Sequence, residues 1–145
     1  MRKVAIESPL APQGERYGSG EDELKKEFEE NVEYAKCAML DCFTRGEAPF
    51  ASHLLYPQVL DDADKAQRRA GMRAGLHISD AMDAHVVYTD LGISRGMKSG
   101  IARAEKNGKD VEMRTMKEWT RKVGPSVGAS DSWETTGKAT DTTDG

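Results

Sequence analysis

Three short stretches of the sequence place acidic, hydroxyl and imidazole side chains next to glycine or proline. They are Glu7 to Pro9, Ser52 to Tyr56 and Thr89 to Met97. A carboxylate can serve as a base, a nucleophile or an acceptor for a ligand hydroxyl, and a histidine can exchange a proton or contact a heterocycle. Glycine lets a ligand approach the backbone closely. The three stretches are therefore candidates for one binding or catalytic site.

Two acids, Asp90 and Glu7, are the candidate catalytic residues. Asp90 precedes the turn "LGISRG", where it would meet a ligand; alternatively, it is a turn residue whose carboxylate binds nearby amides. Glu7 ends an apolar stretch, so its burial would require a partner. That partner is either a ligand hydroxyl or an arginine such as Arg16 or Arg68.

The other candidate site residues would bind the substrate. They are Ser8, Pro9, Ser52, His53, Tyr56, Arg68, Gly92, Ser94, Gly96 and Met97. His53 would act as a general acid or contact the edge of a base, and Tyr56 would stack on a ring, unless both are structural residues beside an apolar run. Ser94 is expected to cap the helix behind the site. The loop at 8–20 would cradle an anion, although it matches neither a Walker loop nor a dinucleotide fingerprint.

Metal and thiol chemistry find no support in the sequence. No group of His, Cys, Asp or Glu has the spacing of metal ligands, and no Gly-x-Ser-x-Gly elbow is present. Cys37 and Cys42 lie five residues apart in a helical pattern, which suits neither a disulfide framework nor a zinc site. We predict that both cysteines are buried and that the protein uses no metal and no cofactor.

Alternating strand and helix patterns surround the candidate residues. Strands are predicted at 3–7, 49–55, 84–90 and 109–114, and helices at 21–43, 61–82 and 94–107. The first helix carries an apolar stripe that includes Phe28, with Ser19 as its N-cap and Gly46 after its end. In the second helix, Gly71 and Gly75 would allow close packing on a sheet.

This alternation predicts right-handed crossovers between parallel strands. We expect a three-layer α/β/α sandwich with a parallel sheet of four or five strands in flavodoxin-like order. In an open parallel sheet, ligands bind beyond the carboxyl ends of the strands. The fold would therefore bring the three candidate stretches to one edge of the sheet.

Length and composition predict one domain of an acidic protein. The chain has 145 residues, is 37% hydrophobic and has a net charge of -4. We expect the domain at 1–123, ending in a short helix at 115–122, and a disordered tail at 124–145, where 12 of 22 residues are Gly, Ser or Thr. The charge argues against a nucleic-acid polymer as partner, and the missing apolar stretches argue against a membrane. We expect a cytoplasmic location, since the first ten residues lack the apolar core of a signal peptide, and leave open a homo-oligomer.

Four segments together resemble an uncharacterised family. "ESPLAP", "GEAPFASHLLYPQVLDD", "RRAGMRAG" and "VVYTDLGISRGMKSGIARAEKNGKDVEMR" are similar to small phage and bacterial proteins (DUF4406- and DUF7768-like) related to the nucleoside 2-deoxyribosyltransferases. The resemblance covers residues 3 to about 119. Its specific motifs are "SHLLY" and the paired "YTDLGIS" and "GM", whereas the likeness to the transferases rests on element order and on a glycine-containing turn after an acid.

The resemblance implies a nucleoside or nucleotide ligand and chemistry at an N-glycosidic bond, by hydrolysis or base exchange. In the transferases, a glutamate on the first turn of the following helix attacks the anomeric carbon, but here the matching position is Gly100. A retaining transfer needs a nucleophilic carboxylate under the sugar, so Asp90 or Glu7 would have to replace that glutamate. The alternatives are a non-catalytic binder of a nucleotide-derived ligand and a phage-encoded host-interaction protein with a vestigial pocket.

Overall fold

The structure is a computed structural model that describes residues 1–116 and 119. The predicted tail at 124–145 and most of the predicted short helix at 115–122 lie outside the described residues. Thr115, Met116 and Trp119 are described and belong to no helix. The elements are β1 (Lys3–Glu7), α1 (Glu21–Thr44), β2 (Ala48–Phe50), α2 (Ser52–Leu55), the 3-10 helix η1 (Tyr56–Gln58), α3 (Lys65–Ser79), β3 (Ala84–Tyr88), α4 (Arg95–Lys106) and β4 (Asp110–Arg114).

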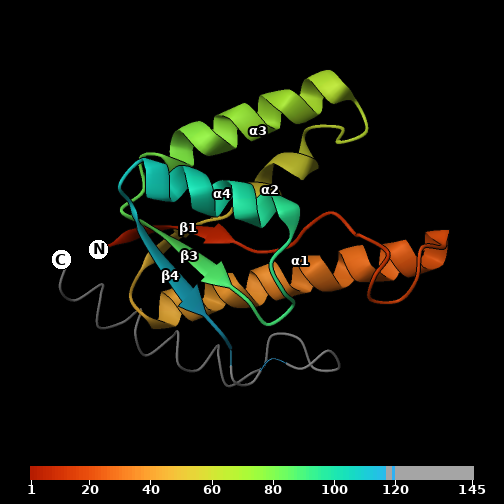
Figure 1. Cartoon of the computed structure of the whole chain (residues 1–145), viewed down its shortest axis with the longest axis horizontal. Helices are drawn as coiled ribbons and strands as arrows, with labels where there is room; N and C mark the ends of the chain where they lie inside the picture. Colours follow the sequence, from red (N-terminus) through yellow and green to blue (C-terminus); the bar gives the residue numbers. More distant parts are fainter. Residues whose placement is uncertain (117–118, 120–145) are drawn as a thin grey trace.

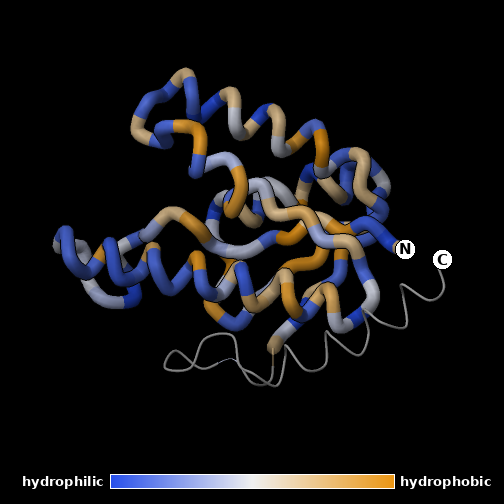
Figure 2. The backbone as a smooth tube through the Cα atoms, turned by 180° about the vertical axis from the view of Figure 1, so that it is seen from behind, coloured by the Kyte–Doolittle hydropathy of each residue, from blue (hydrophilic) through white to orange (hydrophobic). Residues whose placement is uncertain are grey.

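The four strands form one parallel sheet in the order β2-β1-β3-β4. This order confirms the predicted flavodoxin-like α/β fold, and β1 pairs with β3 in parallel, with Glu7 opposite Val87. Figure 1 shows α1 on one side of the sheet and α3 and α4 on the other, as the right-handed crossovers require. Figure 2, in which the tube is coloured by residue hydropathy, shows hydrophobic residues in the central strands.

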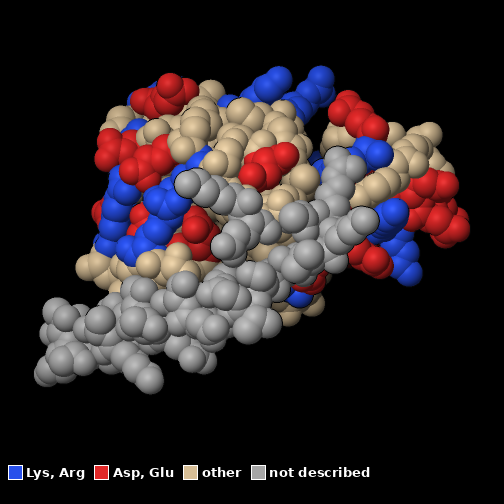
Figure 3. Space-filling view, turned by 90° about the horizontal axis from the view of Figure 1, so that it is seen from below, with Lys and Arg blue, Asp and Glu red and all other residues tan. Residues whose placement is uncertain are grey.

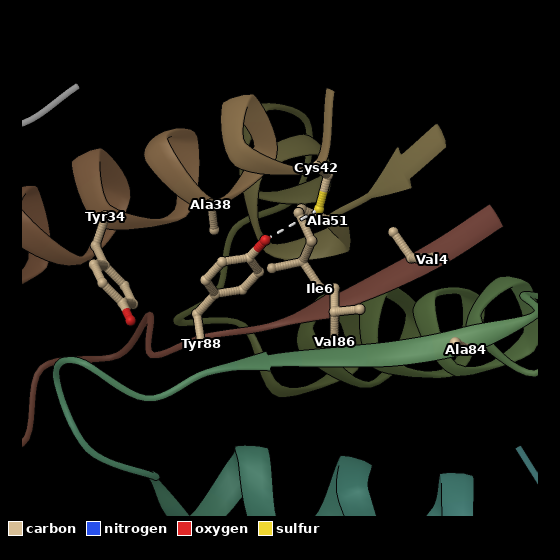
Figure 4. Packing of buried hydrophobic residues seen from close by; sticks show 9 residues of the cluster. All are labelled: Val4, Ile6, Tyr34, Ala38, Cys42, Ala51, Ala84, Val86 and Tyr88. Carbon is tan, nitrogen blue, oxygen red and sulfur yellow. Dashed lines mark hydrogen bonds between the residues drawn. The ribbon is translucent and has the colours of Figure 1, made fainter. Parts of the chain in front are cut away.

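The main core lies between α1 and the sheet. Tyr34, Ala38 and Cys42 of α1 face side chains of β1 and β3, and all five residues of β3 are buried (Figure 4). A strand covered on both faces reads as a continuous apolar run, which explains the "AHVVY" sequence of β3. The one polar member of that run is His85.

Helix α1 begins at Glu21, as predicted, but its N-cap differs from the predicted one. Its N-cap is Gly20 rather than Ser19, and no side chain caps it. Three acids, Glu21, Asp22 and Glu23, occupy the first turn instead, where carboxylates favour the helix dipole. Figure 3 shows acidic side chains at this end of the molecule, with basic side chains beside them. At the other end, Gly46 follows the helix with φ +74°, as predicted.

The predicted apolar stripe of α1 is out of phase in its first half. Phe28 is 38% exposed, whereas Glu27 and Asn31 are buried. The buried polar pair binds the preceding loop, so tertiary contacts and not hydrophobic spacing set this face.

The predicted second strand at 49–55 is wrong beyond Phe50. β2 is an edge strand of three residues, and the chain then forms α2, in which the Tyr56 amide donates to the Ser52 carbonyl. Ser52, His53 and Tyr56 therefore lie on helical turns and not at a strand end. A short apolar run does not distinguish these two structures by its periodicity.

Helix α3 is shorter than predicted and packs elsewhere. It begins after Asp64, whose side chain accepts hydrogen bonds from two backbone amides of the first turn. A Cβ atom on Gly75 would lie 3.0 Å from the Ser52 Cβ, and one on Gly71 would lie 3.0 Å from Leu60 Cδ1. The two glycines thus allow close approach to α2 and η1, not to the sheet. Among the described residues, no helix has the length and apolarity needed to cross a membrane.

Candidate functional site

A cleft of about 470 Å³ lies at the carboxyl edge of the sheet, between β1 and β3. The crossovers from these neighbouring strands leave in opposite directions, so this is the point where parallel sheets bind ligands. The cleft is lined by Pro9, Ala11, Gln13, Glu15, Arg16, Glu27, Asp90, Leu91, Gly92, Ile93 and Ser94. Four predicted site residues, namely Pro9, Asp90, Gly92 and Ser94, therefore come together here.

Asp90 lines the cleft but is already well bound. Its Oδ2 accepts a hydrogen bond of 2.7 Å from the Tyr34 hydroxyl, and the Met116 amide donates to both carboxylate oxygens at 3.1 and 3.2 Å. Burial and the bond to Asp90 raise the pKa of Tyr34 well above its ordinary value, so the phenol stays protonated. The carboxylate thus fixes the turn after β3 to α1 and to the chain after β4.

The loop after β1 holds an anion, but that anion belongs to the chain itself. The amides of Gln13 and Gly14 donate to the Glu27 carboxylate at 2.7 and 3.1 Å. Arg16 pairs with Glu30 and also donates to Asn31. The backbone donors predicted to cradle a ligand anion are therefore used by α1.

Glu7 has a partner that the sequence did not predict. Its Oε2 lies 3.2 Å from Nδ1 of His85, and neither Arg16 nor Arg68 pairs with it. The Glu7 side chain is 19% exposed and that of His85 only 3%. The Glu7 side chain is thus mostly buried and held by His85, and it is not among the residues that line the cleft.

The space occupied by the Glu7 carboxylate is the space that a side chain on α4 would fill. A Cβ atom built on Gly100 would lie 2.6 Å from Glu7 Oε1 and 2.7 Å from Glu7 Cδ, and would contact Oε2 most closely. No carbon tolerates such contacts, so position 100 must be glycine while Glu7 points this way. The strand carboxylate and the helix glycine form one local arrangement.

Ser8 and His53 form a second pair, directly after the end of β1. The Ser8 Oγ lies 2.7 Å from His53 Nε2. Burial lowers the pKa of His53 to about 4, so the ring is neutral near pH 7 and Nε2 can accept a hydrogen bond from the Ser8 hydroxyl. His53 also lines a smaller hollow of about 130 Å³, together with the predicted residues Ser52, Tyr56 and Arg68.

The helix behind the cleft starts as predicted. Ser94 is the N-cap of α4, and its Oγ accepts a hydrogen bond of 3.3 Å from the Met97 amide. Met97 is 2% exposed, and its sulfur accepts a hydrogen bond from the Ser94 amide. Met97 therefore supports the turn and is not part of the cleft lining. Gly96 has open space around its Cβ position.

Three residues that shape the site, Glu27, Tyr34 and His85, were not predicted from the sequence. His85 had a detectable signal, because it is the only polar residue in a strand that should be buried on both faces. Glu27 and Tyr34 had none, since both sit at ordinary positions of an amphipathic helix.

The cysteines behave as predicted. Cys37 and Cys42 are buried, and burial raises their pKa values to about 12 and about 11, so neither is a thiolate at neutral pH. Within 1–116 and 119, no three His, Cys, Asp or Glu side chains are arranged to hold a metal ion.

Comparison with known families gives one match. A family model described as a domain of unknown function, DUF7768, matches residues 2–114, which include every element described above. A search of curated proteins finds no significant match. The chain therefore belongs to the DUF7768 family.

Proposed function

We propose that this member of the DUF7768 family acts on the N-glycosidic bond of a nucleoside or nucleotide, with Glu7 as the reacting carboxylate. The proposal starts from the resemblance to the nucleoside 2-deoxyribosyltransferases, in which a glutamate extends from the position matched by Gly100. The observation that carries it is the Glu7 carboxylate, which lies where a side chain at Gly100 would begin. A carboxylate is thus supplied from β1 near the point where the side chain of such a glutamate would leave the helix.

In this mechanism, a Glu7 oxygen attacks the anomeric carbon while the bond from that carbon to the base nitrogen breaks. The base leaves with the bonding electron pair and takes a proton from water. Attack by water on the glycosyl ester then completes hydrolysis, and attack by a second base completes exchange. His85 holds the carboxylate through its 3.2 Å contact with Oε2 and leaves Oε1 for the sugar.

Two hollows beside the chain after β1 divide the ligand in this proposal, and the sugar extends from the cleft toward Glu7, which lines neither hollow. Pro9 and Ala11 line the cleft, and Leu10, between them, lines the smaller hollow. The cleft has three carboxylates and a guanidinium that is already paired, which suits a hydroxyl-rich sugar better than a phosphate. The smaller hollow offers the Tyr56 ring and the His53 imidazole, which suit a base.

A second candidate function, ligand binding without catalysis, is favoured by the internal bonds of both acids. Asp90 accepts bonds from Tyr34 and Met116, and Glu7 pairs with His85. Groups that are held this firmly can recognise hydroxyls without reacting.

Chromatography of free base, released from a panel of nucleosides and 5′-nucleotides with and without an acceptor base, tests the proposal. We expect base release by the native chain, its loss in Glu7→Gln, and no change in Glu105→Gln, an exposed acid at the far end of α4. Stabilisation by nucleosides without base release would favour the binder. Neither release nor binding across the panel would reject both functions.

A further inference from the structure

A groove of about 590 Å³ separates α3 from α4, away from the carboxyl-edge cleft. Its lining consists of Ala70, Arg73, Ala74, Leu76, His77 and Arg103. A volume of this size is typical of small-molecule sites, which also combine apolar walls with a few convergent polar groups. Every ionisable group in this lining is basic, although the whole chain has a net charge of -4.

The groove is built by contacts at one end of the two helices. Asp80, directly after α3, accepts two hydrogen bonds from Arg103, at 2.9 and 2.7 Å, and one from Asn107 at 3.1 Å. The other flank of α3 rests on α2 and η1 through Gly71 and Gly75. Figure 1 shows the two helix axes diverging from the end that Asp80 joins.

Small residues keep the groove open. Ala70 and Ala74 lie one turn apart on the α3 wall, and a larger side chain at either position would fill the space. Arg73 has no ion pair within the described part of the chain. Arg103 uses Nε and Nη2 for Asp80, which leaves the Nη1 donors of its guanidinium for another acceptor.

We propose that this groove binds a small organic anion, with a phosphate or carboxylate between Arg73 and Arg103 and an apolar part against Ala70, Ala74 and Leu76. Arginine is the side chain best suited to such oxyanions, because its planar donors pair with two oxygens at once. His77 adds a further ring nitrogen on the same wall. This site is separate from the one in the proposed function and does not depend on it.

Titration of the full chain with phenyl phosphate, benzoate and phenol, followed by calorimetry and by amide NMR shifts, tests the site. Phenyl phosphate and benzoate distinguish the two oxyanions, and phenol tests the ring without charge. We expect binding of at least one anion but not of phenol, with about 10-fold weaker affinity in Arg73→Gln, as loss of one charge-assisted hydrogen bond implies. Ala74→Leu should abolish binding by filling the groove without changing any charge.

Two control variants separate the groove from other sites. Arg69→Gln removes an exposed cation of α3 that is not part of the lining, and Glu7→Gln alters the proposed catalytic centre; both should bind the anion normally. The proposal would be overturned if Arg73→Gln and Ala74→Leu bound the anion with the affinity of the native chain. It would also be overturned if phenol bound as tightly as the anions. It would also be overturned if no probe binds and sedimentation shows a dimer that Ala74→Leu dissociates, because the groove would then accept a second copy.

Discussion

Substituting Gly100 by alanine tests the central geometric finding most directly. In a helix interior, Gly→Ala ordinarily stabilises by about 1 kcal/mol. At position 100 the new methyl group would collide with the Glu7 carboxylate, which would have to leave His85. Losing a hydrogen bond to a charged group costs about 1.5–3 kcal/mol, so we expect a net destabilisation of about 0.5–2 kcal/mol.

Urea unfolding of four proteins measures this effect: the native chain, Gly100→Ala, Glu7→Ala and the double variant. If the clash is the cause, removing the Glu7 side chain should relieve it. The double variant should then be more stable than the sum of the single effects predicts, by about 1.5–3 kcal/mol, because the helix gain cancels and the whole cost of the clash remains.

The matched control is Gly96→Ala on the same helix. A Cβ atom on Gly96 would meet nothing within 4 Å, so this variant should keep or gain stability. Gly100→Ala behaving like Gly96→Ala, or strict additivity with Glu7→Ala, would refute the shared-volume argument.

Three further variants test other parts of the site and its support. The pKa of His53 falls from its ordinary 6.5 to about 4 on folding because the ring is buried, so the unfolded chain binds the proton more tightly. The free energy of unfolding should therefore fall as the pH drops from 6.5 toward 4, by at most about 1.4 kcal/mol per pH unit. In urea unfolding at several pH values, this dependence should be weaker for His53→Gln. Arg114 of β4 donates hydrogen bonds of 2.8 and 2.7 Å to the two carboxylate oxygens of buried Glu47. Arg114→Met removes both bonds, so the free energy of unfolding, measured with heat or urea, should fall by about 3–5 kcal/mol. A change near zero would mean that water replaces the two bonds. Asp90→Asn should cost about 1 kcal/mol through its bond to Tyr34 while base release persists; abolished release in a folded variant would make Asp90 a reacting acid.

The sequence predicted the sheet because each level of the argument agreed. Short β-branched runs alternate with helical patterns, and the rule for right-handed crossovers leaves few possible orders. Gly46 and Ser94 marked helix boundaries correctly because their roles depend on local backbone geometry. Prediction failed at 51–55 and at Phe28, where packing between distant segments decides the outcome.

The grouping of some candidate residues at one cleft was predicted, whereas their contacts were not. Strand ends place Pro9, Asp90 and Gly92 at one cleft, which needs only topology. The partners of the acids are a different matter, since the Glu7–His85 pair joins residues 78 positions apart in the sequence. No local pattern specifies which buried groups face each other across two strands and a helix.

Moving the carboxylate from strand position 7 to helix position 100 gives a last prediction. Because the Glu7 side chain and any side chain at Gly100 compete for one volume, only one of the two positions can carry a carboxylate. Gly100→Glu alone should therefore unfold at much lower urea than the native chain, whereas Glu7→Ala with Gly100→Glu should regain most of the loss. If base release depends on a carboxylate in this volume, the double variant should also regain activity that Glu7→Ala lacks. A double variant that is folded and binds nucleosides but stays inactive would show that the direction from which the carboxylate reaches the sugar matters, and would tie catalysis to the strand position itself.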